Sequence, residues 1–216
     1  MNSAPLKKVL LSVFPVLGVA ALALWYRNAG CPFASDSAYA ALVLGRLAGI
    51  IAALGVMGQL LVMSRASWLE PLTGGALPVK WHHRAGLVIP LALLVHPPLI
   101  VWFNSVQSGT PFMEQYLNML NWDDIPAAAG GEGLIIAAVL LSLPLLRSRL
   151  PYGLWQKTHL AVYAGLALSI GHQLEFGGDL SGGNPGFALV WYALLAFTAV
   201  NAAWFRLVQP RLGAKA

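Results

Sequence analysis

The sequence predicts an all-α, polytopic membrane protein built as a bundle of six transmembrane helices, and three observations lead to this prediction. Of its 216 residues, 58% are hydrophobic and 10% are charged, with a mean hydropathy of +0.68, which is typical of chains that cross a membrane several times. Apolar runs long enough to span a bilayer recur along the chain. Basic residues gather at alternate ends of these runs, which accounts for the net charge of +5 without a nucleic-acid partner.

The six predicted helices form one domain over residues 1–216 and are separated by polar or glycine-rich segments. The first follows Lys7 and Lys8, and its length favours a membrane span over a cleaved signal peptide. The longest polar stretch, 107–132, is expected to be a loop, and so is the glycine-rich segment 176–186. We expect the helices at residues 9–26, 40–63, 82–106, 129–146, 155–175 and 187–207.

Charged residues predict the orientation of the bundle, because cytoplasmic loops carry an excess of Lys and Arg. One side receives nearly all the basic residues: Lys7, Lys8, Arg65, Lys80, Arg84, Arg147, Arg149, Lys157, Arg206, Arg211 and Lys215. The other side receives Arg27 and the acidic residues Asp36, Glu114, Asp123, Asp124, Glu132, Glu175 and Asp179. We therefore expect both termini in the cytoplasm and the chain in a bacterial inner membrane. Tryptophans are expected at the two membrane interfaces, with Trp81, Trp155 and Trp204 inside and Trp25, Trp102 and Trp191 outside.

Every histidine lies on the stretches assigned to the third and fifth helices. His159 and His172 are about 20 Å apart along a helix, so one lies near each face of a hydrocarbon core about 30 Å thick. His82 and His96 repeat this arrangement on the third helix. One interpretation makes these side chains interfacial polar contacts, but their pairing by level favours metal ligands. Two imidazoles per level leave the zinc tetrahedron incomplete and suit a haem with both axial positions filled. The sequence thus predicts haem sites, for two haem b groups, between helices three and five.

Helical geometry selects His82 rather than His83 as the inner ligand of helix three. A helix turns about 100° per residue, so His82 lies about 40° from His96, whereas His83 lies about 140° from it. We expect His83 to face solvent or a haem propionate. His159 and His172 are also about 140° apart, so the fifth helix is expected to tilt, bend or carry a bulge.

These residues resemble the ferric reductase-like transmembrane family, which includes the cytochrome b cores of ferric reductases and NADPH oxidases. The matching motifs are His82-x3-Gly86-x9-His96, Trp155-x3-His159-x12-His172, Gly45-Arg46-Leu47-Ala48-Gly49 and Arg206-x3-Pro210. The resemblance implies an inner haem between His82 and His159 and an outer haem between His96 and His172. It also implies that electrons flow outward, with ferric iron as the acceptor.

The chain departs from larger members of that family in three respects. It ends at Ala216 without flavin or nicotinamide domains, so we expect electrons to come from a flavin reductase or a quinol on the inner side, or from a missing part of the protein. Ile100 stands where the oxidases place a further histidine, which counts against a superoxide-producing site. Gly165 stands where some members place an aromatic residue between the haems. An iron–sulfur cluster is excluded as a carrier, because Cys31 is the only cysteine.

The chain also resembles MsrQ (YedZ), the haem-binding membrane subunit of the periplasmic methionine sulfoxide reductase system, which lacks an equivalent of His82. The chain is therefore expected to be the membrane component of an oxidoreductase, and two electron-transfer functions stay open for it. One reduces an outside acceptor such as ferric iron, and the other passes electrons from quinol or flavin to a periplasmic oxidoreductase. A non-redox membrane carrier or assembly factor is the alternative from another class.

Arg46 lies about two turns inside the outer end of helix two, at a depth where a charge is costly. Its side chain either snorkels to the outer interface or pairs with an anion. A haem propionate is the anion that we expect.

Overall fold

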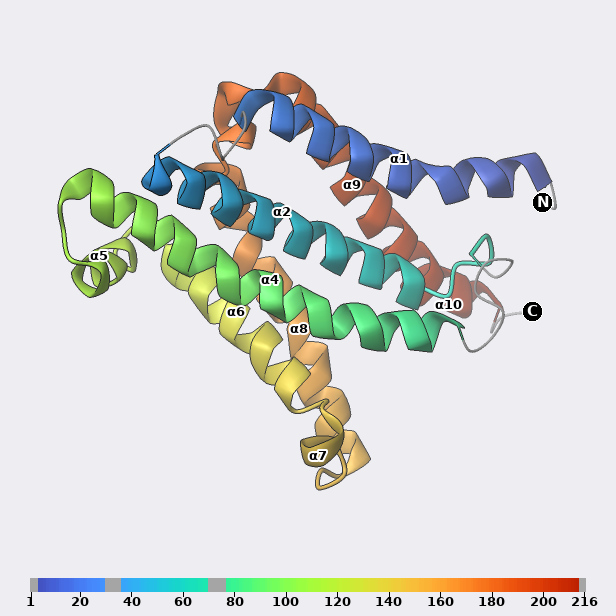
Figure 1. Cartoon of the computed structure of the whole chain (residues 1–216). Coiled ribbons are helices and arrows are strands. Elements are labelled where there is room, and N and C mark those ends of the chain that lie inside the picture. The colour runs from blue at the N-terminus through green and yellow to red at the C-terminus, as the bar shows by residue number, and fades with distance from the viewer. Residues whose placement is uncertain (1–3, 30–35, 70–76, 214–216) are drawn as a thin grey trace. The chain divides into compact units, whose positions relative to one another are not determined.

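Every regular element in the described part of the chain is a helix, as a computed structural model shows (Figure 1). The structure describes residues 4–29, 36–69 and 77–213. Cys31, Lys215 and most of the loop before the third predicted helix lie outside these ranges.

The six predicted helices correspond to α1, α2, α4, α6, α8 and α9, with shorter elements between and after them. The long helices are α1 (Ala4–Ala29), α2 (Ser37–Met63), α4 (Leu77–Ser108), α6 (Ile125–Leu140), α8 (Tyr152–Phe176) and α9 (Pro185–Ala203). The short ones are α5 (Phe112–Met119), α7 (Pro144–Arg147) and α10 (Gln209–Gly213), with the π-helical turns η2 (Asp179–Gly183) and η3 (Trp204–Val208).

The prediction for the fourth helix was wrong at both ends. The helix α6 begins at Ile125 and ends at Leu140, and α7 follows as a separate turn. The break has a local cause, because a residue before proline is disfavoured in the helical region. Leu143 accordingly has an extended ψ of 142°, just before Pro144.

The segment 107–132 was expected to be a loop, and this prediction was also wrong. It contains α5, whose Gln115 and Met119 are buried, and the first two turns of α6. Glu132 therefore lies within a helix rather than in an outer loop. The polar composition of the segment reflects exposed helix faces rather than irregular chain.

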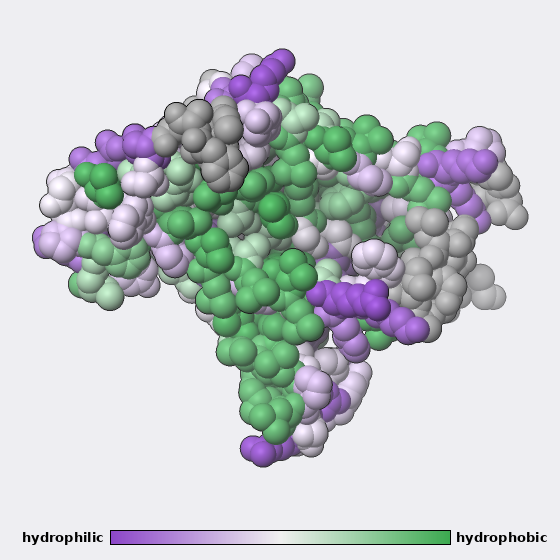
Figure 2. Space-filling view, in the orientation of Figure 1, coloured by the Kyte–Doolittle hydropathy of each residue, from purple (hydrophilic) through white to green (hydrophobic). Residues whose placement is uncertain are grey.

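Four helices of the described residues are long and apolar enough to cross a membrane: Pro5–Ala29, Ser37–Met63, Val79–Ser108 and Pro185–Leu212. The helix α6 has 16 residues and is shorter than these spans, and α8 is less apolar. Figure 2 shows hydrophobic residues over the middle of α4, where Leu87, Val88 and Leu91 are exposed. Large apolar side chains that face outward along a helix fit a lipid environment, and we describe the chain as an integral membrane protein.

The chain forms two compact units. The first comprises residues 1–30, 50–89 and 184–216, and the second comprises residues 31–49 and 90–183. Consequently α2 and α4 each contribute one part to each unit.

In the first unit, α1 packs against α9. Asn184 caps α9 by accepting from the Phe187 N–H, and its Nδ2 donates to the Leu24 carbonyl oxygen at 3.1 Å. Trp25 and Trp191, predicted at the outer interface, are 4% and 3% exposed. Both side chains are therefore buried where α1 and α9 pack, and their depth at the outer interface stays a prediction.

In the second unit, α6 and α8 form a closely packed hairpin. A Cβ added to Gly131 would lie 2.5 Å from the Gly165 carbonyl oxygen, and one added to Gly165 would lie 2.6 Å from the Gly131 carbonyl oxygen. Glycine at both positions allows this approach. A side chain at position 165 would point into α6, which explains why no bridging aromatic residue stands there.

Candidate functional site

His96 of α4 and His172 of α8 face each other within the second unit. Their ring centroids are 6.0 Å apart, and the ring planes are tilted by 55°. Two metal–nitrogen bonds of about 2 Å each, with the ring radii added, span about 6 Å. The two imidazoles are thus spaced as axial ligands of one metal ion would be.

The ring of His96 is held by the backbone of α2. Its Nδ1 lies 2.8 Å from the Gly45 carbonyl oxygen, which can only accept a hydrogen bond. Nδ1 therefore carries the proton, and in the neutral ring Nε2 carries the lone pair that binds a metal. A Cβ added to Gly49 would lie 3.0 Å from Nδ1 of His96, so glycine is what lets the ring lie against the helix.

The ring of His172 is held by stacking instead. It stacks on Phe176, with ring centroids 6.0 Å apart and an angle of 26° between the ring planes. Phe176 in turn stacks on Trp122, with ring centroids 5.8 Å apart and an angle of 19° between the planes. Its Nδ1 is buried and has no hydrogen-bond partner in the described part of the chain. A buried nitrogen without a partner is costly and indicates that a group is still to bind or turn towards it.

His82 is held by Gln59 within the first unit. The Gln59 side chain donates from Nε2 to the His82 carbonyl oxygen at 2.8 Å, and its Oε1 lies 2.7 Å from Nδ1 of His82. Because the amide oxygen can only accept, Nδ1 is the donor and Nε2 again carries the lone pair. His83, by contrast, is exposed.

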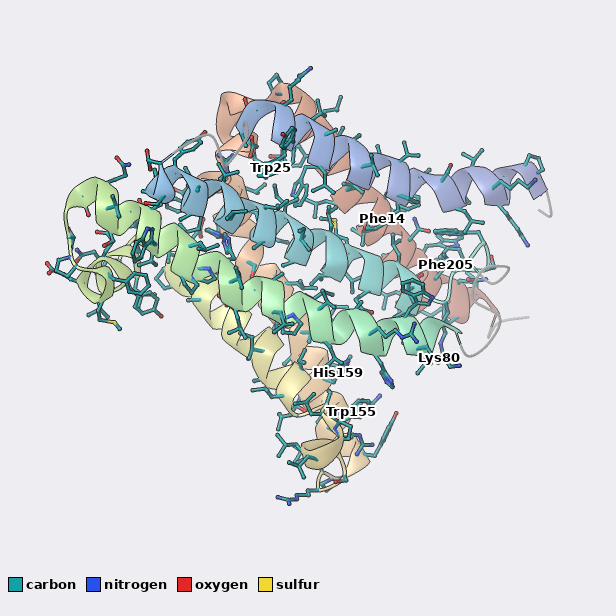
Figure 3. All side chains as sticks on the ribbon, in the orientation of Figure 1. Phe14, Trp25, Lys80, Trp155, His159 and Phe205 are labelled. Carbon is teal, nitrogen blue, oxygen red and sulfur yellow. The ribbon has the colours of Figure 1, made fainter. Side chains whose placement is uncertain are left out.

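His159 is held by the hydroxyl of Ser142, just after α6. The hydroxyl donates to the Ala138 carbonyl oxygen at 2.7 Å, so it accepts from Nδ1 of His159 and from Nε1 of Trp155, both at 3.1 Å. The Trp155 ring also stacks on His159, with ring centroids 5.3 Å apart (Figure 3). The guanidinium of Arg147 lies 4.5 Å from the centroid of the Trp155 ring. This ring is thus held by a hydrogen bond and by a stacked face.

The inner pair divides between the two units, with His82 in the first and His159 in the second, so its ligation of one haem stays a prediction. The fifth helix was expected to tilt, bend or carry a bulge; α8 is a continuous α-helix, so a bulge is not present in it. These two histidines therefore leave α8 about 140° apart around its axis.

Arg46 forms an ion pair with the buried carboxylate of Asp179, in η2. A Cβ added to Gly178 would lie 3.6 Å from the guanidinium. The anion beside Arg46 in this structure is thus a protein carboxylate, and a haem propionate as a further partner stays a prediction. Since Arg46 follows Gly45 in α2, the ion pair ties the helix that holds His96 to the segment after α8.

These arrangements fit a haem better than a metal site built from protein ligands alone. Among the described residues, no group of three or more His, Cys, Asp or Glu side chains gathers to hold a metal ion. Paired imidazoles and a buried, unpartnered nitrogen remain, which suit a planar cofactor that needs only two protein ligands.

Sequence reasoning missed the groups that orient the histidines: the Gly45 carbonyl, Gln59 and Ser142. The sequence contained only a weak signal for one of these groups. Gln59 is a polar side chain inside an apolar run, and such residues usually have a partner. The partner itself is fixed only by how the helices pack.

A family model described as ferric reductase like transmembrane component matches residues 48–170. The matched range contains His82, His96 and His159, and it ends two residues before His172. Neither the curated proteins nor the solved structures gave a match. Because the matched residues make up more than half of the 216, the chain belongs to the ferric reductase-like transmembrane component family.

Proposed function

We propose that the chain carries electrons across the membrane through two b-type haems, an outer one held by His96 and His172 and an inner one held by His82 and His159. The observation that carries this proposal is the 6.0 Å separation of the His96 and His172 rings, with Nδ1 of His96 tied to a carbonyl. Membership of a family that generally binds haem supports it. When bound, haem supplies an iron that accepts and releases one electron at a time.

The role of the residues of this chain is to hold and orient the four histidine rings. The Gly45 carbonyl, the Gln59 amide oxygen and the Ser142 hydroxyl each accept a hydrogen bond from the Nδ1–H of a histidine, which fixes three of the four rings with Nε2 available to a metal. If two imidazoles bind each iron, they would leave it no open position for a substrate. The acceptor would then be reduced at the protein surface rather than at the metal.

We further propose the six-span topology with both termini in the cytoplasm, in a bacterial inner membrane. The close Gly131–Gly165 contact supports α6 and α8 as a membrane hairpin in addition to the four long spans. The basic residues assigned to the cytoplasmic side would attract an acidic flavin reductase, and a quinol is the other donor. The acceptor outside is ferric iron or a periplasmic oxidoreductase.

The test is a haem count on purified protein. A reduced-minus-oxidised spectrum with a pyridine haemochrome assay should give two b-type haems per chain, and His83→Ala should keep both. Absence of b-type haem from freshly purified protein would contradict the proposal and favour a carrier or assembly factor.

Direction is tested in sealed vesicles of known orientation. A reduced flavin donor on the cytoplasmic face should reduce the protein faster than the same donor on the outer face. The reverse order would contradict outward electron flow.

A further inference from the structure

Three of the four predicted ligands share a feature that the fourth lacks. Nδ1 of His82, His96 and His159 each lies 2.7–3.1 Å from an oxygen that accepts its proton. Nδ1 of His172 is buried without a partner in the described part of the chain. Since a metal-bound histidine almost always donates its other N–H to an oxygen, the fourth ring calls for an acceptor.

Asp124 is the group placed to supply it. Its carboxylate lies over Gly171, the residue before His172: a Cβ added to Gly171 would lie 2.7 Å from Cγ and from both carboxylate oxygens of Asp124. The glycine is therefore what lets the carboxylate reach the backbone of α8. Both residues belong to the second unit.

The backbone of Asp124 also has an uncommon conformation. Its φ is +59°, in the left-handed region that is strained for most side chains and tolerated by Asp and Asn. It stands at the N-cap of α6, where an Asp side chain normally accepts from its own helix, yet it makes no capping hydrogen bond. The carboxylate is instead directed at α8, against the backbone of Gly171.

We propose that Asp124 is a positioning residue that accepts the Nδ1 proton of His172 and so orients this ring as the second outer ligand. The proposal rests on the proposed function, because it needs His172 to bind iron through Nε2. A carboxylate on Nδ1 makes the imidazole a stronger electron donor than the Gly45 carbonyl makes His96. The outer haem then has one ligand backed by a neutral oxygen and one backed by an anion, which stabilises the ferric form and lowers the reduction potential of that haem.

The experiment compares Asp124→Asn with Asp123→Asn in the haem-loaded protein. The two variants lose the same charge from the same loop, and Asn keeps both the shape of Asp124 and its tolerance of the left-handed conformation. Redox titration should show the outer haem of Asp124→Asn at a more positive potential than in the unaltered protein. The same variant should lose its outer haem about ten times faster to an excess of haem acceptor. Asp123→Asn should match the unaltered protein in both measurements, and the inner haem serves as an internal reference.

An outer-haem potential that is the same in both variants and in the unaltered protein would overturn the proposal. So would a lower thermal stability of Asp124→Asn with no change in potential, since that is the mark of a packing role. If Asp124→Asn folds poorly, Asp124→Gly provides the second variant, because glycine fits the left-handed backbone best and deletes the carboxylate. A protein that binds no outer haem even with Asp124 intact would count against the proposed function instead, which keeps the two failures distinguishable.

Discussion

The rings of His96 and His82 have the same hydrogen-bonding state but are held in different ways. Nδ1 of His96 donates to a backbone carbonyl of α2, whereas Nδ1 of His82 donates to a side-chain amide of the same helix. A backbone acceptor is not removed by substitution, so its place depends on how closely the helices approach. A side-chain acceptor can be removed by one substitution, and that substitution leaves the helix backbone in place. The outer site should therefore be sensitive to crowding at α2, and the inner site to the identity of single polar side chains.

The largest effect is expected from crowding the outer site. Gly49→Ala would place a Cβ 3.0 Å from Nδ1 of His96, so the ring must shift away from the Gly45 carbonyl. We expect the purified variant to hold about one haem per chain instead of two, measured by the pyridine haemochrome assay.

Gly58→Ala is the matched control, because the new Cβ on the same helix would meet only Phe14 at an ordinary 3.5 Å. It should keep both haems. Equal haem contents in the two alanine variants would show that crowding at Gly49 does not matter.

A smaller effect is expected from loosening α2. Asp179→Asn removes the charge partner of Arg46, which leaves a cation that is 27% exposed and otherwise embedded. We expect a loss of about 3 kcal/mol in stability, the lower end of the range for broken buried pairs, measured by thermal unfolding in detergent.

Arg46→Gln is the companion variant. If the ion pair is the whole role of Arg46, both variants should lose the outer haem to the same extent. Haem loss from Arg46→Gln alone would instead assign a propionate to this arginine.

At the inner site, Gln59→Leu should weaken haem retention by about 10-fold, because both contacts of the amide with His82 are lost while helix packing is kept. Gln59→Glu keeps an acceptor on Nδ1 and should retain the haem better than leucine does. Haem transfer to an excess of apomyoglobin measures the rate of loss. Identical rates for the two variants would remove the assigned role of the amide.

The smallest effect is expected from Ser142→Ala, because stacking on Trp155 still holds the His159 ring. Nδ1 of His159 and Nε1 of Trp155 would lose a shared acceptor, so we expect the inner-haem midpoint potential to shift and haem content to stay at two. Ser148→Ala, at an exposed serine of the same connection, is the control. A shift in both variants would mean that the potential does not report on this hydrogen bond.

Helical periodicity alone distinguished His82 from His83, since it depends only on residue spacing along one element. In the structure His82 contacts Gln59 and His83 is exposed, as expected for a side chain facing solvent; the choice of His82 as the iron ligand stays a prediction. Depth along a helix likewise indicated that Arg46 needs an anion. It did not indicate Asp179, because the segment that folds back over α2 is set by tertiary packing.

Composition also misplaced Glu132 and the start of α6, since polar residues on an exposed helix face resemble a loop in the sequence. Gly165 shows what the sequence could not predict about packing. Its lack of a side chain was plain from the sequence, but the close approach of the Gly131 carbonyl that requires it was not.

The central claim is that His96 and His172 bind the same iron, and a double variant tests it most directly. His96→Ala and His172→Ala should each reduce the haem content from two to one per chain. Because both changes remove the same haem, the double variant should also retain one, with the inner-haem spectrum unchanged. A double variant that retains no haem, while each single variant retains one, would show that the two histidines serve different haems and would contradict the account.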